Sequence, residues 1–318
     1  MNGISSALEI RDLSYSYRGD WLPSRHQALR GISISVKEGE AFGFLGHNGA
    51  GKTTTIKCIL GLIRPSSGLI EIMGQSSRRT DSRRRVGYLP EQPYFYDHLS
   101  VRELVEFYAH LAGVSSGALR SAVRDALDKT GIGSRAASPL RSLSKGLIQR
   151  VALAQAIVAG PRLLILDEPF SGLDPIARKE FRDILADLKR QGVTIFMSSH
   201  ILSDIESFCE RAAILSQGSL QGIFEMREVP SLLDCRYELV TTGSVPIPPE
   251  LKAAAETTVS ETNFTRLIFN DREKAAAALR AGVTAGLEIQ SFQMISGGLE
   301  ELFLRKTRSV RTDAGYEG

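Results

Sequence analysis

The sequence has few of the residues that would place it among disulfide-stabilised or nucleic-acid-binding proteins. Its 318 residues include three cysteines and one tryptophan, and the formal net charge is only +3. Cys58, Cys209 and Cys235 are scattered without metal-ligand spacing, which argues against a disulfide framework and fits a reducing cytosol. The small net charge gives no reason to expect a nucleic-acid partner, and we expect none.

Long hydrophobic runs are also missing. No apolar run reaches the ~18 residues that a membrane-spanning helix requires, and residues 151–166 are interrupted by Gln155, Pro161 and Arg162. The first residues do not combine a basic segment with an apolar core, so we expect no secretion signal. The hydrophobic content of 42% is ordinary for a globular protein. The length suggests two domains, or one large α/β domain with an appendage.

A glycine-rich segment is the strongest signal in the chain. Residues 46–53 read Gly-His-Asn-Gly-Ala-Gly-Lys-Thr and match the phosphate-loop pattern G-x-x-x-x-G-K-[ST]. A predicted buried strand over 41–45 precedes it and a predicted helix over 54–60 follows, so backbone N–H groups and a helix N-terminus would face the phosphates of ATP. We expect Lys52 to contact the β- and γ-phosphates and Thr53 to bind Mg²⁺. The ATP-binding residues expected in this segment are Gly46, His47, Asn48, Gly49, Ala50, Gly51, Lys52, Thr53 and Thr54.

The pattern of apolar residues predicts a phosphate-loop α/β core with two insertions. Residues 7–44 alternate polar and apolar positions, which predicts half-buried antiparallel strands, and 68–74 predicts another strand. A capping-box pattern at Ser100 and Glu103 opens a mostly helical block that extends to residue 160. Further helices are expected over 117–130, 145–159, 175–191 and 201–209, and buried strands over 162–166, 193–197 and 212–215.

The composition changes near residue 225. Prolines separate short predicted strands at 237–240 and 264–269, and an alanine-rich helix is predicted at 272–281. The expected organisation is a nucleotide-binding domain over 1–225 with a helical subdomain at about 93–160, a small α+β domain over 226–305 that closes with a short helix at 298–305, and a disordered tail over 306–318.

Two later motifs place charged side chains at the ends of predicted strands. One buried strand ends in Asp167 and Glu168, and the next ends in Ser-Ser-His, with His200 last. Ligands gather at the carboxyl ends of parallel strands, where the phosphate loop also lies. ATP hydrolysis needs a metal that neutralises phosphate charge and a group that orients water. We therefore expect Asp167 to hold Mg²⁺, Glu168 to polarise the attacking water and His200 to contact the γ-phosphate, with Lys52 as the third catalytic residue.

In order and spacing, these motifs resemble those of the ATP-binding subunit of an ATP-binding-cassette (ABC) transporter over about residues 17–225. Residues 143–150, Leu-Ser-Lys-Gly-Leu-Ile-Gln-Arg, resemble the family signature Leu-Ser-Gly-Gly-Gln-x-Gln-Arg, which other phosphate-loop ATPases lack. The resemblance implies a RecA-like α/β ATPase core with an antiparallel β subdomain and a helical subdomain. It also implies a homodimer in which Ser144 and Gly146 of one subunit cap the γ-phosphate bound by the other. In the family, the segment that holds Asp174 crosses the dimer interface.

The same resemblance indicates which residue stacks on adenine. It also shows two places where this sequence differs from the family pattern. Tyr17 matches the aromatic residue that stacks on adenine, and Tyr15 is the alternative. The signature has Lys145 and Leu147 where Gly and Gln are commonest. Family members carry Gln, which senses Mg²⁺ and the membrane partner, at the position of Glu91; here Gln92 follows, and either residue could serve. Both departures, and the segment 298–304, resemble the ABC-2 type exporter branch.

The resemblance implies an ATPase subunit bound peripherally to the cytoplasmic side of the membrane, where it powers a separate integral-membrane permease, as in an exporter. A cassette that drives a membrane signalling or cell-wall-regulating partner without moving solute is the open alternative. The arginines between residues 78 and 85 are expected on a solvated helix face. The aromatic cluster Tyr94, Phe95 and Tyr96 suits either an exposed groove for the permease or ordinary core packing.

Overall fold

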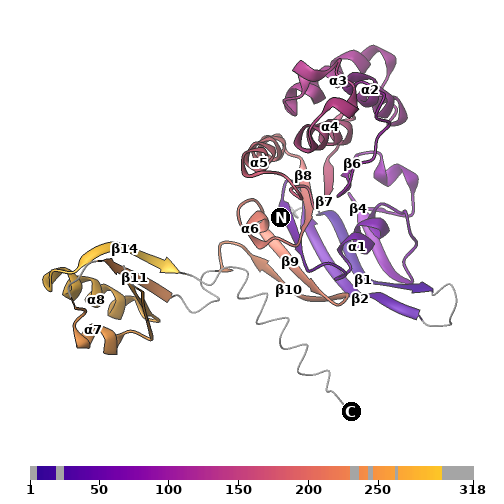
Figure 1. The fold of residues 1–318 in the computed structure, drawn as a ribbon. Coiled ribbons are helices and arrows are strands. Elements are labelled where there is room, and N and C mark those ends of the chain that lie inside the picture. The colour runs from indigo at the N-terminus through magenta and orange to yellow at the C-terminus, as the bar shows by residue number, and fades with distance from the viewer. Residues whose placement is uncertain (1–5, 19–24, 230–235, 243–245, 262–263, 296–318) are drawn as a thin grey trace, which may run out of the picture. The chain divides into compact units, whose positions relative to one another are not determined.

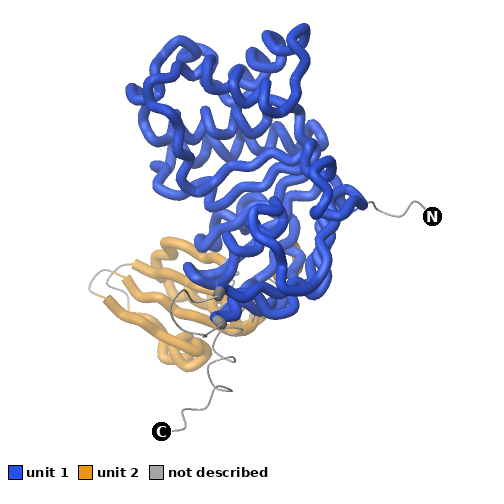
Figure 2. The backbone as a smooth tube through the Cα atoms, turned by 90° about the vertical axis from the view of Figure 1, so that its right-hand side faces the viewer, with its two compact units in different colours: residues 1–226 blue, residues 227–318 orange. Residues whose placement is uncertain are grey.

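The structure is a computed structural model that describes residues 6–18, 25–229, 236–242, 246–261 and 264–295. The chain divides into two compact units, Met1–Met226 and Arg227–Gly318, which Figure 2 shows in separate colours. Among the described residues, no helix combines the length and the apolar character needed to cross a bilayer.

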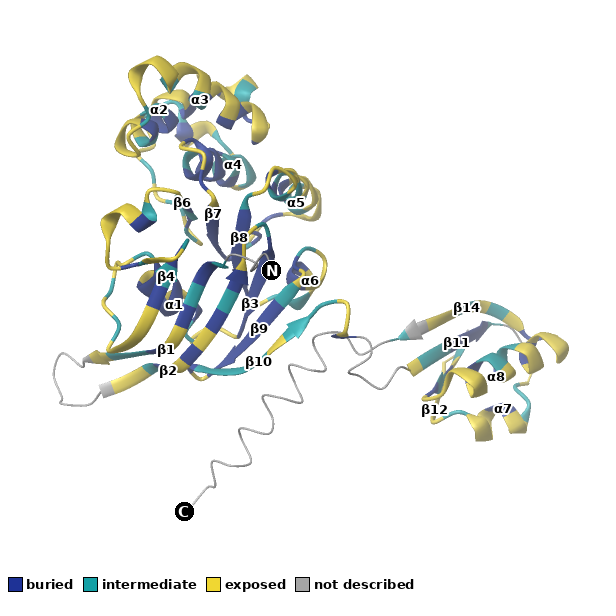
Figure 3. Cartoon of the chain, turned by 180° about the vertical axis from the view of Figure 1, so that it is seen from behind, coloured by how far each residue is buried: buried dark blue, intermediate teal, exposed yellow. Residues whose placement is uncertain are grey.

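A six-stranded sheet forms the centre of the first unit (Figure 1). Its strands pair in parallel except at one edge, where β10 runs antiparallel to β9. All residues of β3, β7 and β8 are buried, as expected for parallel strands that are covered on both faces (Figure 3). Across the sheet the strands are β10 (Ser219–Glu225), β9 (Arg211–Ser216), β3 (Ala41–Leu45), β8 (Thr194–Ser199), β7 (Leu163–Asp167) and β6 (Val86–Leu89).

A second, antiparallel sheet packs against the same core. Buried side chains from its strands join those of the central sheet and of the helix α1 (Lys52–Ile59) in one hydrophobic cluster that includes Ile34, Phe42, Ile56 and Phe196. The order of its strands is β2 (Arg25–Lys37), β1 (Ser6–Arg18), β4 (Ser67–Ile72) and β5 (Gln75–Ser76). This sheet is the antiparallel β subdomain that the alternating sequence pattern predicted.

Three helices form the helical subdomain beyond β6: α2 (Val101–Leu111), α3 (Ser116–Lys129) and α4 (Lys145–Ile157) (Figure 1). The capping box is present, because the Ser100 side chain accepts from the Glu103 N–H and the Glu103 carboxylate accepts from the Ser100 N–H. The 3₁₀ turns η2 (Gly133–Arg135) and η3 (Leu140–Ser142) connect α3 to α4.

Two helices flank the central sheet further along the chain, α5 (Pro175–Arg190) and α6 (Leu202–Glu206). The prediction that the second helix extends to Cys209 is wrong, because the chain turns after Glu206 to enter β9. The arginine-rich segment is also not a regular helix face. It forms the 3₁₀ turn η1 (Thr80–Arg83), and the Arg83 guanidinium donates to the Ser77 carbonyl while its neighbouring arginines are exposed.

The second unit has the element order β-α-β-β-α-β and its own hydrophobic core around Leu239, Leu267 and Phe269. Its antiparallel sheet has the order β12-β13-β11-β14, so β13 separates the parallel strands β11 and β12, as in a ferredoxin-like split βαβ fold. The predicted helix at 298–305 and the tail at 306–318 lie outside the described residues. The elements are β11 (Arg236–Thr242), α7 (Pro249–Ala254), β12 (Thr257–Ser260), β13 (Phe264–Phe269), α8 (Arg272–Thr284) and β14 (Glu288–Ile295).

Candidate functional site

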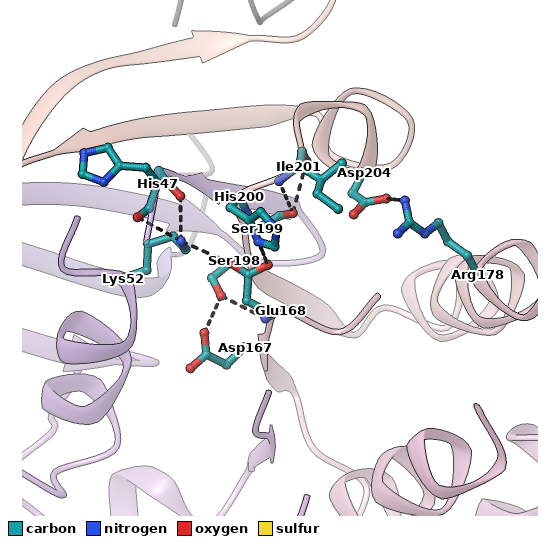
Figure 4. Close-up of polar contacts among 11 residues, drawn as sticks. His47, Lys52, Asp167, Glu168, Arg178, Ser198, Ser199, His200, Ile201 and Asp204 are labelled. Carbon is teal, nitrogen blue, oxygen red and sulfur yellow. Dashed lines mark hydrogen bonds and ion pairs between the residues drawn. The ribbon is translucent and has the colours of Figure 1, made fainter. Parts of the chain in front are cut away.

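The phosphate loop joins β3 to α1 through glycines that the structure requires. Gly51 has φ 110°, and a Cβ atom there would lie 2.9 Å from the Ala28 carbonyl oxygen. The Lys52 side chain is 6% exposed, and its ammonium donates to the carbonyls of Gly46 at 2.6 Å and His47 at 3.3 Å (Figure 4). These contacts hold the lysine along the inside of the loop.

A cavity of about 370 Å³ lies against this loop, and most of the expected ATP-binding residues line it. Of the predicted loop residues, Gly46 and Ala50 do not line the cavity. The Gly46 carbonyl accepts a hydrogen bond from Lys52, and Ala50 is fully buried. Two lining residues, His26 and Ala28, were not predicted. They lie on β2, which pairs with β1 so that His26 is opposite Tyr17. The lining residues are Tyr17, His26, Ala28, His47, Asn48, Gly49, Gly51, Lys52, Thr53, Thr54, Glu91 and Glu168.

Tyr17, and not Tyr15, presents an aromatic ring to this cavity. The residue is 40% exposed, and its hydroxyl lies 3.2 Å from the Thr54 hydroxyl of the phosphate loop. Tyr15 is half-buried against the hydrophobic core. The two rings meet edge to face, with their centroids 4.8 Å apart. A half-exposed aromatic face beside a phosphate loop is suited to stacking on a nucleobase.

Asp167 lies at the tip of β7 and is 2% exposed. The pKa of its carboxyl group is raised, because the effect of burial is larger than that of the hydrogen bonds from Ser198 and Thr53, which lower it. The Ser198 hydroxyl donates to Asp167 Oδ1 at 2.6 Å. The side chain of Thr53 in the loop and the carboxylate of Asp167 therefore lie within hydrogen-bonding distance of each other.

Glu168 lies between the phosphate-loop lysine and His200 (Figure 4). Its Oε1 is 3.1 Å from Lys52 Nζ, and its Oε2 is 2.8 Å from His200 Nδ1. The backbone N–H of His200 also donates to Oε2, at 3.2 Å. Glu168 is 7% exposed and has φ 50°, a conformation that few non-glycine residues adopt. Its N–H donates to the Ser198 side chain and carbonyl, which fixes this conformation.

The side-chain oxygens of Thr53 and Asp167 suit Mg²⁺ better than a transition metal. Among the described residues, no group of three or more His, Cys, Asp or Glu side chains could hold a metal ion. Mg²⁺ instead takes one or two protein ligands together with phosphate oxygens and water, which suits Thr53 and Asp167. Of the two residues proposed as the metal sensor, both are exposed, and Glu91 lines the cavity whereas Gln92 does not.

A second hollow, of about 530 Å³, lies at the N-terminus of α4 and contains the signature residues. Ser144 is the N-cap of α4, with its side chain accepting from the Leu147 N–H, and Lys145 lies over Gly172. The hollow shares no lining residue with the phosphate-loop cavity. Its lining consists of Ser144, Lys145, Gly146, Leu147, Arg150, Gly172, Leu173, Asp174, Ile176, Ala177 and Glu180.

The aromatic cluster after β6 divides between surface and core. Tyr94 and Tyr96 are 92% and 66% exposed, whereas Phe95 is half-buried and its ring meets Tyr108 edge to face. Of the three side chains, Phe95 alone is partly buried. The two tyrosines form an exposed aromatic patch close in sequence to Glu91.

The chain is similar to several proteins of one family. The family model described as "ABC transporter" matches residues 29–171. An uncharacterized ABC transporter ATP-binding protein, sll0415 of Synechocystis, is 41% identical over 75% of this chain and 68% of that protein. The bacitracin transport ATP-binding protein BcrA of Bacillus licheniformis is 38% identical over 71% of each chain. The linearmycin resistance ATP-binding protein LnrL of Bacillus subtilis is 31% identical over 89% of this chain and 94% of that protein.

A solved structure of an ATP-binding subunit of an ABC transporter is 32% identical, with a TM-score of 0.63 over 71% of this chain and 93% of that chain. The likeness extends beyond the phosphate loop, which many nucleotide-binding proteins share, because the family model matches residues 29–171 and the solved structure shares the fold over 71% of this chain. The chain belongs to the ATP-binding subunits of ABC transporters, which are ATPases.

Proposed function

We propose that this chain is the ATP-hydrolysing subunit of an exporter, and that it powers a separate membrane permease by ATP-driven formation of a homodimer. The observation that carries the dimer is the separation of the two hollows. One contains the phosphate loop and Glu168, and the other contains Ser144 and Asp174, with no lining residue in common. A nucleotide bound at the phosphate loop would meet a signature segment only when a second copy supplies it.

The roles proposed at the first hollow follow from the side chains there. Tyr17 would stack on adenine, and Lys52 would exchange its carbonyl and carboxylate contacts for phosphate oxygens. Mg²⁺, when bound by Thr53 and Asp167, would neutralise phosphate charge. Glu168 would accept a hydrogen bond from the attacking water and orient it, because one of its oxygens is already fixed by His200.

At the second hollow, a helix N-terminus would face the γ-phosphate of the ATP that the other subunit binds. The first turn of α4 contains no acidic residue that would repel this phosphate. Backbone N–H groups at the start of a helix and the positive end of its dipole both favour an anion. Ser144 and Gly146 would contact the phosphate, and Lys145 would add a positive charge to the hollow.

The exporter assignment rests on the relatives, and the proposed contact with the permease rests on the exposed aromatic patch. BcrA is named for bacitracin transport and LnrL for linearmycin resistance, and export is one way in which a transporter subunit provides resistance. Tyr94 and Tyr96 offer a site for the permease, because exposed aromatic side chains are frequent anchors of interfaces. We place the subunit on the cytoplasmic side of the membrane, bound peripherally through this partner.

The dimer is tested with the Glu168→Gln variant, which should bind ATP and hydrolyse it slowly. Size-exclusion chromatography with light scattering should show a dimer with ATP and Mg²⁺, and a monomer with ADP. A Glu168→Gln, Ser144→Arg double variant is the matched control and should stay monomeric with ATP. A strictly monomeric Glu168→Gln protein, even with the copurified permease present, would contradict the shared-nucleotide model.

A further inference from the structure

An ion pair links the two helices that lie beside the contact between Glu168 and His200. Arg178 of α5 places Nη1 3.3 Å from Asp204 Oδ1 of α6, and the side chains are 27% and 5% exposed, respectively. In Figure 4 this pair lies beyond Ile201, on the far side of His200 from Lys52. Nothing in the chemistry proposed above uses either residue.

The helix α6 follows His200 after a single residue and is too short to be stable alone. It has only five residues, Leu202–Glu206, and a single residue, Ile201, separates it from His200. Isolated helices of this length do not form in water, so its position depends on tertiary contacts. One such contact is apolar: Ile205 packs so closely on β3 that a Cβ atom at Gly43 would lie 2.6 Å from Ile205 Cγ2.

The other contact is the charged one at Asp204. Burial raises the pKa of the Asp204 carboxyl, and the charges of Arg178 and Arg182 lower it. Arg178 contacts the buried carboxylate directly, so its removal would leave that charge without its hydrogen-bonded partner.

The arginine of this ion pair lies in the first turn of α5. The Arg178 N–H donates to the Asp174 carbonyl at 2.9 Å, and the Asp174 carboxylate caps the helix by accepting from the Ala177 N–H at 2.8 Å. Asp174 and Ala177 both line the second hollow. Arg178 therefore connects the segment that lines this hollow with the helix that follows His200.

We propose that Arg178 and Asp204 are positioning residues for ATP hydrolysis, whose ion pair holds α6 so that His200 stays in contact with Glu168. The proposal rests on the roles proposed above for Glu168 and His200. Small misplacements of a catalytic group lower the rate of the chemical step more than they lower substrate affinity. Loss of the pair should therefore lower kcat and leave nucleotide binding nearly unchanged.

The test compares Arg178→Ala and Asp204→Ala with the wild-type protein at saturating ATP and Mg²⁺. We expect kcat to fall about 10-fold or more in each variant, with the Kd of a fluorescent ATP analogue changed by less than about 2-fold. Asp204→Asn, which keeps the oxygen that accepts from Arg178, should retain most of the rate. The Arg178→Ala, Asp204→Ala double variant should be no slower than the slower single variant, because both changes remove one interaction.

Lys189→Ala is the matched control, because Lys189 lies on the same helix, is 28% exposed and pairs with Glu210 rather than with α6. It should keep the wild-type kcat. Thermal unfolding of every variant shows whether the folded fraction is unchanged at the assay temperature. An equal loss of kcat in Lys189→Ala, or a loss in Arg178→Ala that matches the fraction unfolded, would reduce the pair to a structural role and overturn the proposal.

Glu168→Gln is assayed in parallel, so that failure of the positioning role can be distinguished from failure of the roles proposed for Glu168 and His200. If it loses hydrolysis while Arg178→Ala and Asp204→Ala both keep the wild-type kcat, the positioning role is wrong and the site assignment stands. If Glu168→Gln itself hydrolyses ATP normally, the proposed roles at the site fail, and the positioning proposal fails with them.

Discussion

At the scale of single residues, the conformation of Glu168 fits the catalytic role that we propose for it. A non-glycine residue at φ 50° is strained, and such strain persists only where surrounding contacts impose it. Here Ser198 imposes it through two hydrogen bonds with the Glu168 N–H. The result is a buried carboxylate with one oxygen near Lys52 and the other near His200.

Glu168→Gln should abolish most hydrolysis and retain ATP binding. The amide keeps the size and one oxygen of the side chain but cannot act as a base, and general-base effects are worth at least ~100-fold in rate. ATPase rate and nucleotide affinity are measured on the same preparation. A rate close to that of the wild-type protein would remove Glu168 from the catalytic role.

Tyr17→Ala should weaken ATP binding about 10-fold, because stacking of an aromatic ring on a base contributes about 1–3 kcal/mol. Tyr17→Phe keeps the ring and loses only the hydroxyl that contacts Thr54, so its affinity should stay close to that of the wild-type protein. Tyr15→Ala should instead lower thermal stability, since Tyr15 packs on the core. Equal ATP affinity in Tyr17→Ala and wild type would place adenine elsewhere.

At the scale of elements, the parts of the site that follow strands were the ones that the sequence could predict. A buried apolar run ending in Asp167 and Glu168 determines where both carboxylates lie once the strands are parallel. His26 and Ala28 were missed because their place depends on which strand pairs with β1, and alternation predicts a strand but not its neighbour. The contact between Arg178 and Asp204 likewise depends on the packing of two helices that local sequence does not specify.

The segment after β6 should contact the permease through its exposed tyrosines. A Tyr94→Ala, Tyr96→Ala double variant should keep its melting temperature and nucleotide affinity, because both side chains are exposed. It should lose most of the permease in copurification from membranes, since aromatic anchors dominate many interfaces. Phe95→Ala is the contrasting variant and should melt at a lower temperature, because Phe95 packs on Tyr108. Copurification at wild-type strength by the tyrosine variant would move the contact to another surface.

At the scale of the whole molecule, composition alone predicts that a second unit exists but not how its strands are ordered. Prolines and an alanine-rich run predicted a small α+β unit after residue 225, and the structure has a separate core there. Its strand order, with β13 between β11 and β12, could not be predicted, because adjacent strands in the sheet are not always adjacent in the chain. All of the residues proposed for ATP chemistry lie in the first unit.

Two copies of the chain should share their two sites, and mixing inactive variants tests this directly. Lys52→Ala removes the phosphate-loop charge, and Ser144→Arg fills the signature hollow, so each homodimer has two defective sites and should be inactive. In a heterodimer, Lys52 of the Ser144→Arg chain meets Ser144 of the Lys52→Ala chain, and one site is intact. If the sites act independently, an equal mixture that exchanges subunits should regain about a quarter of the wild-type rate.

The control for this mixture is the Lys52→Ala chain combined with a Lys52→Ala, Ser144→Arg chain, which forms no intact site and should stay inactive. Exchange of subunits is verified with differently tagged chains that are isolated as a heterodimer. An inactive heterodimer of the first pair has two explanations, which a second measurement separates. If ATP still brings the two chains together when Glu168→Gln is added to both, hydrolysis requires two intact sites. If ATP does not bring them together, one intact shared site does not hold a dimer, which contradicts the shared-nucleotide model.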